Sequence, residues 1–146
     1  MSNRTLTYRG LLAVDTEQRL LLSTKKGEMG YRIKDFQIMV STPGNGNVEL
    51  IGQIFKKSQT PSTTVDFSNN RLLAVALFHD GAANDTTHFM STTIFDNEIF
   101  NQDIFVNITD ATGSSLPGNY YIELEVIKLD ESQAMVATLK DIRNNS

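Results

Sequence analysis

The sequence contains no cysteine and no tryptophan, and it has only two histidines among its 146 residues. The lack of cysteine excludes disulfides, thiol nucleophiles and thiolate metal sites together. A protein metal site uses three or four ligands, so His79 and His88 would need help from carboxylates such as Asp80 and Asp85. The two histidines flank the stretch DGAANDTT, and we interpret them as strand-end residues on either side of a loop.

Long apolar runs and catalytic signatures are also missing. No run approaches the roughly 18 apolar residues of a membrane-spanning helix, and the start, MSNRTLTYRG, lacks the apolar region of a secretory signal. No segment fits a G-x-S-x-G elbow, a P-loop or an H-E-x-x-H helix. The sequence therefore predicts a protein that is not an enzyme, with no catalytic residue, no cofactor, no bound metal and no membrane association.

Charge is spread unevenly along the chain. Residues 1–34 carry seven basic and three acidic side chains, a net charge of +4, and the remainder carries a net charge of −8. The basic part could be a solvated pair of strands, an arm for nucleic acid, or one of two complementary surfaces in an assembly. Net acidity argues against a nucleic-acid partner. Residues 1–8 are interpreted as an extended N-terminal arm, and Arg4, Tyr8 and Arg9 are the candidate interaction residues.

Alternating apolar and polar residues predict strands over most of the chain. Residues 31–40 and 48–55 both alternate, and the turn-rich stretch STPGNGN between them predicts a hairpin-like loop that makes the second strand the antiparallel partner of the first. A short strand is expected near TVDF (64–67). Residues 71–79 are nearly all apolar, and their flanks favour a strand over a buried helix. In residues 120–129 the register shifts near Ile127, which indicates a bulge or a strand end.

The C-terminal stretch changes period. Met135, Leu139 and Ile142 are spaced as one face of an amphipathic helix, and Asp130 with Gln133 resembles a capping box. We therefore expect a closing helix within residues 130–146, with a final edge strand as the rival. Together these patterns predict one domain over residues 1–146, all-β in class: an antiparallel β-sandwich of about eight strands, jelly-roll-like, with a short C-terminal helix.

The stretch TIFDNEIFNQDIFVNITD (93–110) concentrates acidic residues between three Ile-Phe pairs. Asp96, Glu98, Asp103 and Asp110 offer oxygen ligands, so a structural calcium near Asp96–Asp103 is one interpretation. The stretch lacks the glycine of an EF-hand loop, and its apolar pairs will seek burial. We expect instead that Ile99-Phe100 turns inward and that the carboxylates are solvated or hydrogen-bonding loop groups.

Four segments in this order resemble short, poorly characterised virion structural proteins of marine bacteriophages and uncultured marine viruses: YRIKDFQIM, NVELIGQIF, IFDNEIFNQDIFVNITD and NYYIELEVIKL. The resemblance covers most of the chain and brings no catalytic motif or functional residue with it. It implies a non-enzymatic structural protein of a bacteriophage virion, most simply a capsid-associated subunit: a decoration, cement or minor capsid protein.

That resemblance also implies partners and a location. The partners would be other virion proteins, such as the major capsid protein or tail and vertex proteins, and further copies in a homo-oligomer. The location would be the virion, assembled in the host cytoplasm. The alternative is a tail- or spike-associated module for host recognition or carbohydrate binding. With no tryptophan and only four tyrosines, three of them in or beside predicted strands, the scaffold interpretation is preferred.

Overall fold

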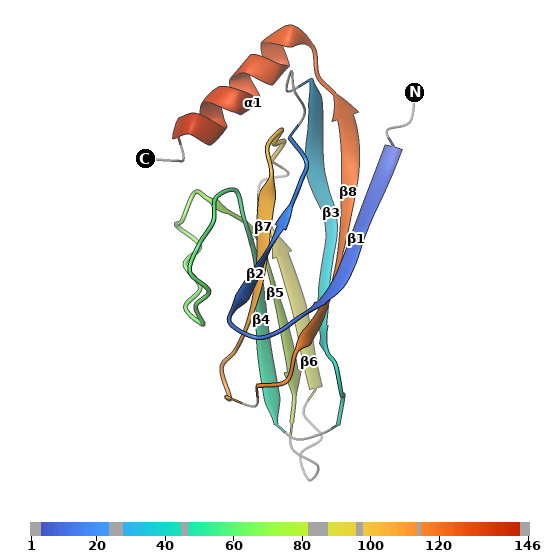
Figure 1. Ribbon diagram of the computed structural model, residues 1–146, viewed down its shortest axis with the longest axis vertical. Helices are drawn as coiled ribbons and strands as arrows, with labels where there is room; N and C mark the ends of the chain where they lie inside the picture. The colour runs from blue at the N-terminus through green and yellow to red at the C-terminus, as the bar shows by residue number, and fades with distance from the viewer. Residues whose placement is uncertain are drawn as a thin grey trace.

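The computed structural model describes residues 4–23, 28–44, 47–81, 88–95, 98–113 and 115–143. Within these residues the chain forms eight strands and one helix, and the strands make two antiparallel sheets that pack face to face (Figure 1). In chain order the elements are β1 (Arg4–Leu12), β2 (Thr16–Leu20), β3 (Met29–Val40), β4 (Val48–Phe55), β5 (Leu72–Asp80), β6 (His88–Ile94), β7 (Ile104–Asp110), β8 (Gly118–Lys128) and α1 (Glu131–Arg143).

The strand order is that of a jelly roll with one strand displaced. The three-stranded sheet has the order β1-β8-β3, and the five-stranded sheet has the order β2-β7-β4-β5-β6. When a long hairpin of eight strands is wound into a jelly roll, β1 pairs with β8, β2 with β7 and β4 with β5. All three pairs occur here. β6 pairs with β5 instead of β3, but Thr92 Oγ1 on β6 donates a hydrogen bond of 2.7 Å to the Phe36 carbonyl oxygen on β3. The predicted fold, an antiparallel jelly-roll-like sandwich, is confirmed.

The inner faces of the two sheets form the main core. On β8, the alternation read from the sequence holds, because Tyr120, Ile122, Leu124 and Val126 are all buried there. Glycine lets the sheets approach closely at one point: a Cβ atom on Gly52 of β4 would lie 2.9 Å from both Ile38 Cγ2 and Phe36 Cζ of β3. The sheet-to-sheet contact at Gly52 is therefore filled by side chains from the opposite sheet.

The predicted hairpin between residues 31–40 and 48–55 is wrong. β3 and β4 lie in different sheets, so the loop after Val40 crosses from one layer to the other; its residues 45–46 lie outside the described part of the chain. β3 pairs with β8, whereas β4 pairs with β5 and β7. Alternation reports which face of a strand is buried, but it does not tell whether two neighbouring strands pair at their edges or stack face to face.

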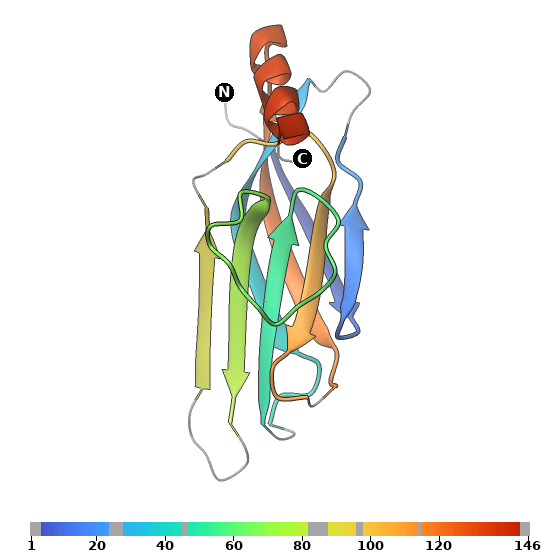
Figure 2. The same ribbon diagram turned by 90° about the vertical axis from the view of Figure 1, so that its left-hand side faces the viewer.

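Three local predictions are settled by the strands themselves. The stretch 71–79 is a strand, as its flanks indicated, and the strand β5 covers Leu72–Asp80. The short strand expected over 64–67 is wrong, because those residues belong to an irregular loop, 56–71, that crosses the outer face of the five-stranded sheet (Figure 2). β8 ends at Lys128, and the register irregularity lies on its partner β3, between Ile33 and Asp35.

The N-terminal arm expected over residues 1–8 differs from the structure over residues 4–8. These residues form the first half of β1 and pair with β8 from Arg4 opposite Val126 to Tyr8 opposite Ile122. The physical reason is that Leu6 and Tyr8 are spaced to pack against the main core, which holds the segment in the sheet. Residues 1–3 lie outside the described residues.

The close approach at Gly52 generates a stability prediction. We expect Gly52→Val to lower the free energy of unfolding by about 1–3 kcal/mol, because the added methyl groups overpack against Phe36 and Ile38. Thr7→Val on exposed β1 is the control, and it should stay within about 0.5 kcal/mol of the wild type. Chemical denaturation measures both, and an unchanged Gly52→Val midpoint would refute the close packing of the sheets.

Candidate functional site

The three predicted interaction residues lie on β1, an outer strand of the three-stranded sheet, but on two different faces. Arg4 and Tyr8 share the inward face, opposite Val126 and Ile122 of β8, whereas Arg9 lies on the outer face. Burial raises the pKa of the core residue Tyr31. Tyr8 raises this pKa further, and Arg4 lowers it. Arg4 and Tyr8 thus lie near a buried hydroxyl, and Arg9 stands apart from them. Their role as interaction residues stays a prediction.

The basic and acidic parts of the sequence meet inside the fold. Arg32 on β3 forms an ion pair with Glu125 on β8, and Arg19 on β2 forms one with Asp103. Each pair joins a residue from the basic first part of the chain to one from the acidic remainder. Part of the uneven charge is therefore neutralised within one molecule rather than displayed as two opposite surfaces.

The acidic stretch 93–110 is divided among separate structural contacts. Phe100 is buried and bridges to Tyr31, with 6.1 Å between the ring centroids, as the sequence predicted for this Ile-Phe pair. Glu98 forms an ion pair with the buried Lys56, and Asp110 Oδ1 accepts a hydrogen bond of 2.8 Å from the Thr112 backbone N–H. The carboxylates do not converge on one point; Asp96, named for a possible calcium site, lies outside the described residues.

Asp103 acts as a clamp between the end of β2 and the start of β7. Its Oδ1 accepts hydrogen bonds from the backbone N–H groups of Leu22 and Ser23, at 2.7 and 2.8 Å, and its Oδ2 accepts one from Arg19 Nε at 2.8 Å. Burial alone would raise the pKa of Asp103, but the hydrogen bonds from Ser23, Arg19 and Leu22 outweigh it and hold the pKa below its ordinary value. This carboxylate is thus a structural acceptor.

The histidines occupy neighbouring strand ends, as expected. His79 on β5 lies opposite Phe89, and Asp80 lies opposite His88 on β6. Asp80 is buried and accepts a hydrogen bond of 2.7 Å from the Gly44 backbone N–H. Asp85 lies outside the described residues. Among the residues that the structure describes, no three histidine, aspartate or glutamate side chains gather as metal ligands would.

Helix α1 covers one end of the sandwich (Figure 1) and is attached there by small and polar groups. Asp130 and Gln133 form the predicted capping box, each accepting a hydrogen bond from the other's backbone N–H, at 2.7 and 3.1 Å. Ala134 packs on Leu129 in a small apolar cluster. Two polar contacts complete the attachment: the buried Asn101 donates a hydrogen bond of 2.9 Å to Thr138 Oγ1, and Lys57 Nζ lies 2.6 Å from Asp141 Oδ2.

The large apolar side chains of α1 point away from the sandwich. Four of them are each more than half exposed: Met135, Val136, Leu139 and Ile142. We call these four residues the α1 stripe. The closing helix expected within residues 130–146 is confirmed as α1, but the face that docks is the one with small residues and not the one that carries Met135, Leu139 and Ile142. A signal was present: Ala134, Ala137, Thr138 and Asp141 repeat at the same helical spacing. The α1 stripe is the candidate functional surface.

Asp103 generates a pH-dependent prediction. Because its folded pKa is lowered, its contribution to stability is complete above the unfolded pKa, about 3.9, and is lost as the pH falls through the folded pKa. Asp103→Asn should therefore cost about 1.5–3 kcal/mol of unfolding free energy at neutral pH, and this difference should shrink in acid.

Chemical denaturation over a pH series measures the effect of Asp103→Asn. Glu49→Gln on β4 is the control, since it removes one negative charge from a side chain that forms no ion pair within the described part of the chain. A difference between Asp103→Asn and the wild type that stays constant down to strong acid would contradict the clamp.

No helix in the described residues is long and apolar enough to cross a membrane. No family model matches the sequence, and no curated protein matches it. Among solved structures, the chain is similar to one titled "The three-dimensional structure of Cocksfoot mottle virus at 2.7A resolution", with 8% sequence identity and a TM-score of 0.42. The likeness covers 91% of this chain and 96% of that one, and it is too distant to carry an argument about function.

Proposed function

We propose that this protein is a non-enzymatic structural subunit of a bacteriophage virion, a capsid-associated protein that stabilises the particle by contacting neighbouring subunits. The observation that carries the proposal is the α1 stripe, a row of large apolar side chains held outward by a helix whose opposite face is anchored. Exposed apolar patches of this kind mark interaction surfaces. The resemblance of the sequence to virion proteins supports the same proposal.

The estimated free energies favour a subunit that contacts several neighbours over an isolated pair of subunits. Four half-exposed side chains present on the order of 400 Å² of apolar surface, a typical size for the largest patch on a protein. At about 25 cal/mol per Å², its burial contributes about 10 kcal/mol. Association costs about 4–15 kcal/mol because the two molecules lose translational and rotational entropy. One α1 stripe is therefore marginal by itself, but a subunit that binds several neighbours at once gains from multivalency.

Further apolar groups are available for such a neighbour on β6, the last strand of the five-stranded sheet. Phe89 and Met90 are each about half exposed there, on opposite faces of the strand. β6 begins at the end of the sandwich far from α1 (Figure 2). An outer strand also presents backbone donors and acceptors to a partner. Contacts at both ends of the molecule are what a subunit bridging two neighbours needs.

Three of the ion pairs that the structure describes have roles that suit a scaffold. Lys56, the first residue of the loop 56–71, pairs with Glu98, Lys57 ties that loop to α1, and Arg19 pairs with Asp103. Each pair fixes one segment to another rather than converging on a cleft. We take the occupant of the α1 stripe to be an apolar groove on an adjacent virion subunit.

Incorporation into particles tests the proposal. Leu139→Glu should be incorporated at least about tenfold less well than the wild type when both are supplied during assembly, because a carboxylate on the α1 stripe must be desolvated in the contact. The ratio of the two chains in purified particles, measured by mass spectrometry, gives the result. The isolated variant should keep its melting temperature, since Leu139 is 52% exposed.

The matched control for Leu139→Glu is Lys140→Gln, which makes the same change in net charge at the next position on α1 without touching the stripe. It should enter particles as the wild type does. Equal incorporation of Leu139→Glu and Lys140→Gln would remove the α1 stripe as the contact surface.

A further inference from the structure

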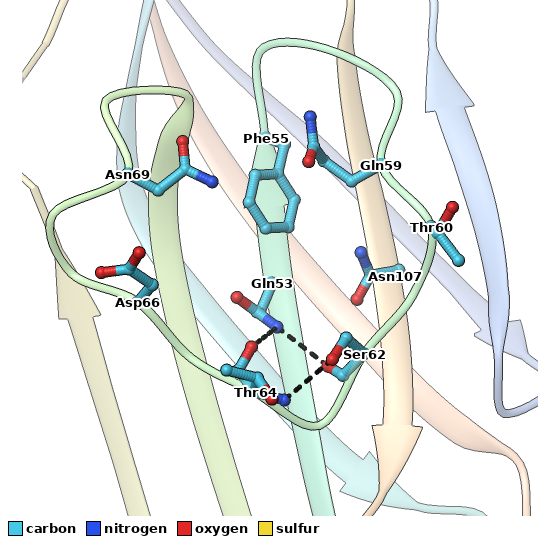
Figure 3. A pocket seen from close by; sticks show the side chains of 9 residues that line it. All are labelled: Gln53, Phe55, Gln59, Thr60, Ser62, Thr64, Asp66, Asn69 and Asn107. Atoms are coloured by element: carbon cyan, nitrogen blue, oxygen red, sulfur yellow. Dashed lines mark hydrogen bonds between the residues drawn. The ribbon is translucent and has the colours of Figure 1, made fainter.

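The loop 56–71 encloses a pocket of about 210 Å³ against the outer face of the five-stranded sheet (Figure 3). Its floor comes from the sheet: Gln53 and Phe55 of β4 and Asn107 of β7, all buried. Its rim comes from the loop, where Ser62 and Asp66 are exposed. A buried floor under an exposed rim makes the pocket reachable from solvent.

Asn107 is the unusual feature of this floor. Its side chain is fully buried, and neither its oxygen nor its nitrogen has a hydrogen-bond partner. Its neighbours are satisfied by the loop: Gln53 Nε2 donates to the carbonyl oxygens of Ser62 and Thr64, at 3.2 and 3.4 Å, and Thr109 Oγ1 donates to that of Ser62 at 3.3 Å. The loop thus binds the neighbours of Asn107 and leaves this carboxamide unpaired in the floor of the pocket.

An unpaired buried carboxamide is costly, because it has given up its hydrogen bonds to water. The outer face of a β-sheet tolerates a valine or threonine at such a position, so folding alone does not call for asparagine there. A group that enters the pocket and both accepts and donates hydrogen bonds would satisfy Asn107 Nδ2 and Oδ1 together.

The lining selects the chemistry of that group. None of the described lining residues is basic, which disfavours an anion. The rim carboxylate of Asp66 is already engaged, since its Oδ1 accepts hydrogen bonds from the Ser68 backbone N–H and hydroxyl at 2.9 and 2.6 Å. Hydroxyl and amide groups line most of the rest, and Phe55 offers an apolar wall. A neutral ligand with several hydroxyl groups and one apolar face fits this combination.

The volume sets the size of the ligand. At about 30 Å³ per water molecule, the pocket has room for roughly seven waters. That is below the range of about 300–1,000 Å³ for sites of drug-sized ligands. One sugar ring therefore fits, and a longer saccharide would have to extend over the rim.

We propose that the pocket beneath the loop 56–71 binds a single neutral sugar residue, with the carboxamide of Asn107 hydrogen-bonding to its hydroxyl groups. This site lies on the outer face of the five-stranded sheet and does not involve the α1 stripe. The inference therefore goes beyond the proposed structural role, and neither depends on the other. It gives the subunit a means to hold a glycan, such as one on a cell surface.

Titration of the isolated protein, followed by heteronuclear NMR, tests the site. The probes are D-glucose, D-galactose and N-acetyl-D-glucosamine. At least one should shift the amide signals of Gln53, Asn107 and the loop 56–71 in a saturable way. If all three leave these signals unchanged, the pocket holds only water and the proposal is overturned.

Two variants separate binding from folding. Asn107→Leu keeps the shape of the side chain and removes both polar atoms, so affinity should fall at least about tenfold. Thr60→Trp, at an exposed rim position, should block the mouth without disturbing the floor. Gln37→Leu, on the exposed outer face of β3, should bind as the wild type does. Unchanged affinity in both Asn107→Leu and Thr60→Trp would place binding elsewhere and overturn the proposal.

Discussion

The apolar contact between the inner faces of the two sheets is the interaction on which the rest of the structure depends. β8 and β3 supply one face and β4, β5 and β7 the other, and glycine at position 52 lets them meet without a gap. This contact buries one face of every central strand. The outer face of the five-stranded sheet is left outside this contact. It carries its own apolar cluster around Ile51 and Phe55, which another segment of the chain must bury.

The loop 56–71 and the helix α1 are the two coverings that follow from that constraint. The loop crosses the outer face and is fixed by sheet side chains, including Gln53 and Thr109, and it encloses the pocket over Asn107. α1 closes one end and is fixed by alanines and polar contacts. In both cases the attachment uses small or polar groups. Large apolar residues on α1 are left facing outward, and the buried carboxamide of Asn107 under the loop is left without a hydrogen-bond partner.

The sequence correctly predicted those features that depend on the periodicity of residues along a single strand or helix. The inward residues of β8, the strand character of β5 and the capped helix α1 all follow from local patterns. It failed where the answer depends on a distant segment. β3 and β4 look like a hairpin until their pairing with β8 and β7 is known, and the spacing of Met135 and Leu139 on α1 does not tell which face of the helix docks. Asn107 could not be singled out at all, since its isolation exists only because a loop far away in sequence passes over it.

We propose that this chain is held by neighbours in a virion, with its charged pairs serving the fold and its α1 stripe serving assembly. The measurement that tests this proposal most directly is the copy number of the chain in purified particles of the phage proposed to encode it, by quantitative mass spectrometry. The account predicts many copies per particle, in a fixed ratio to the shell subunit. Absence of the chain from purified particles would contradict it.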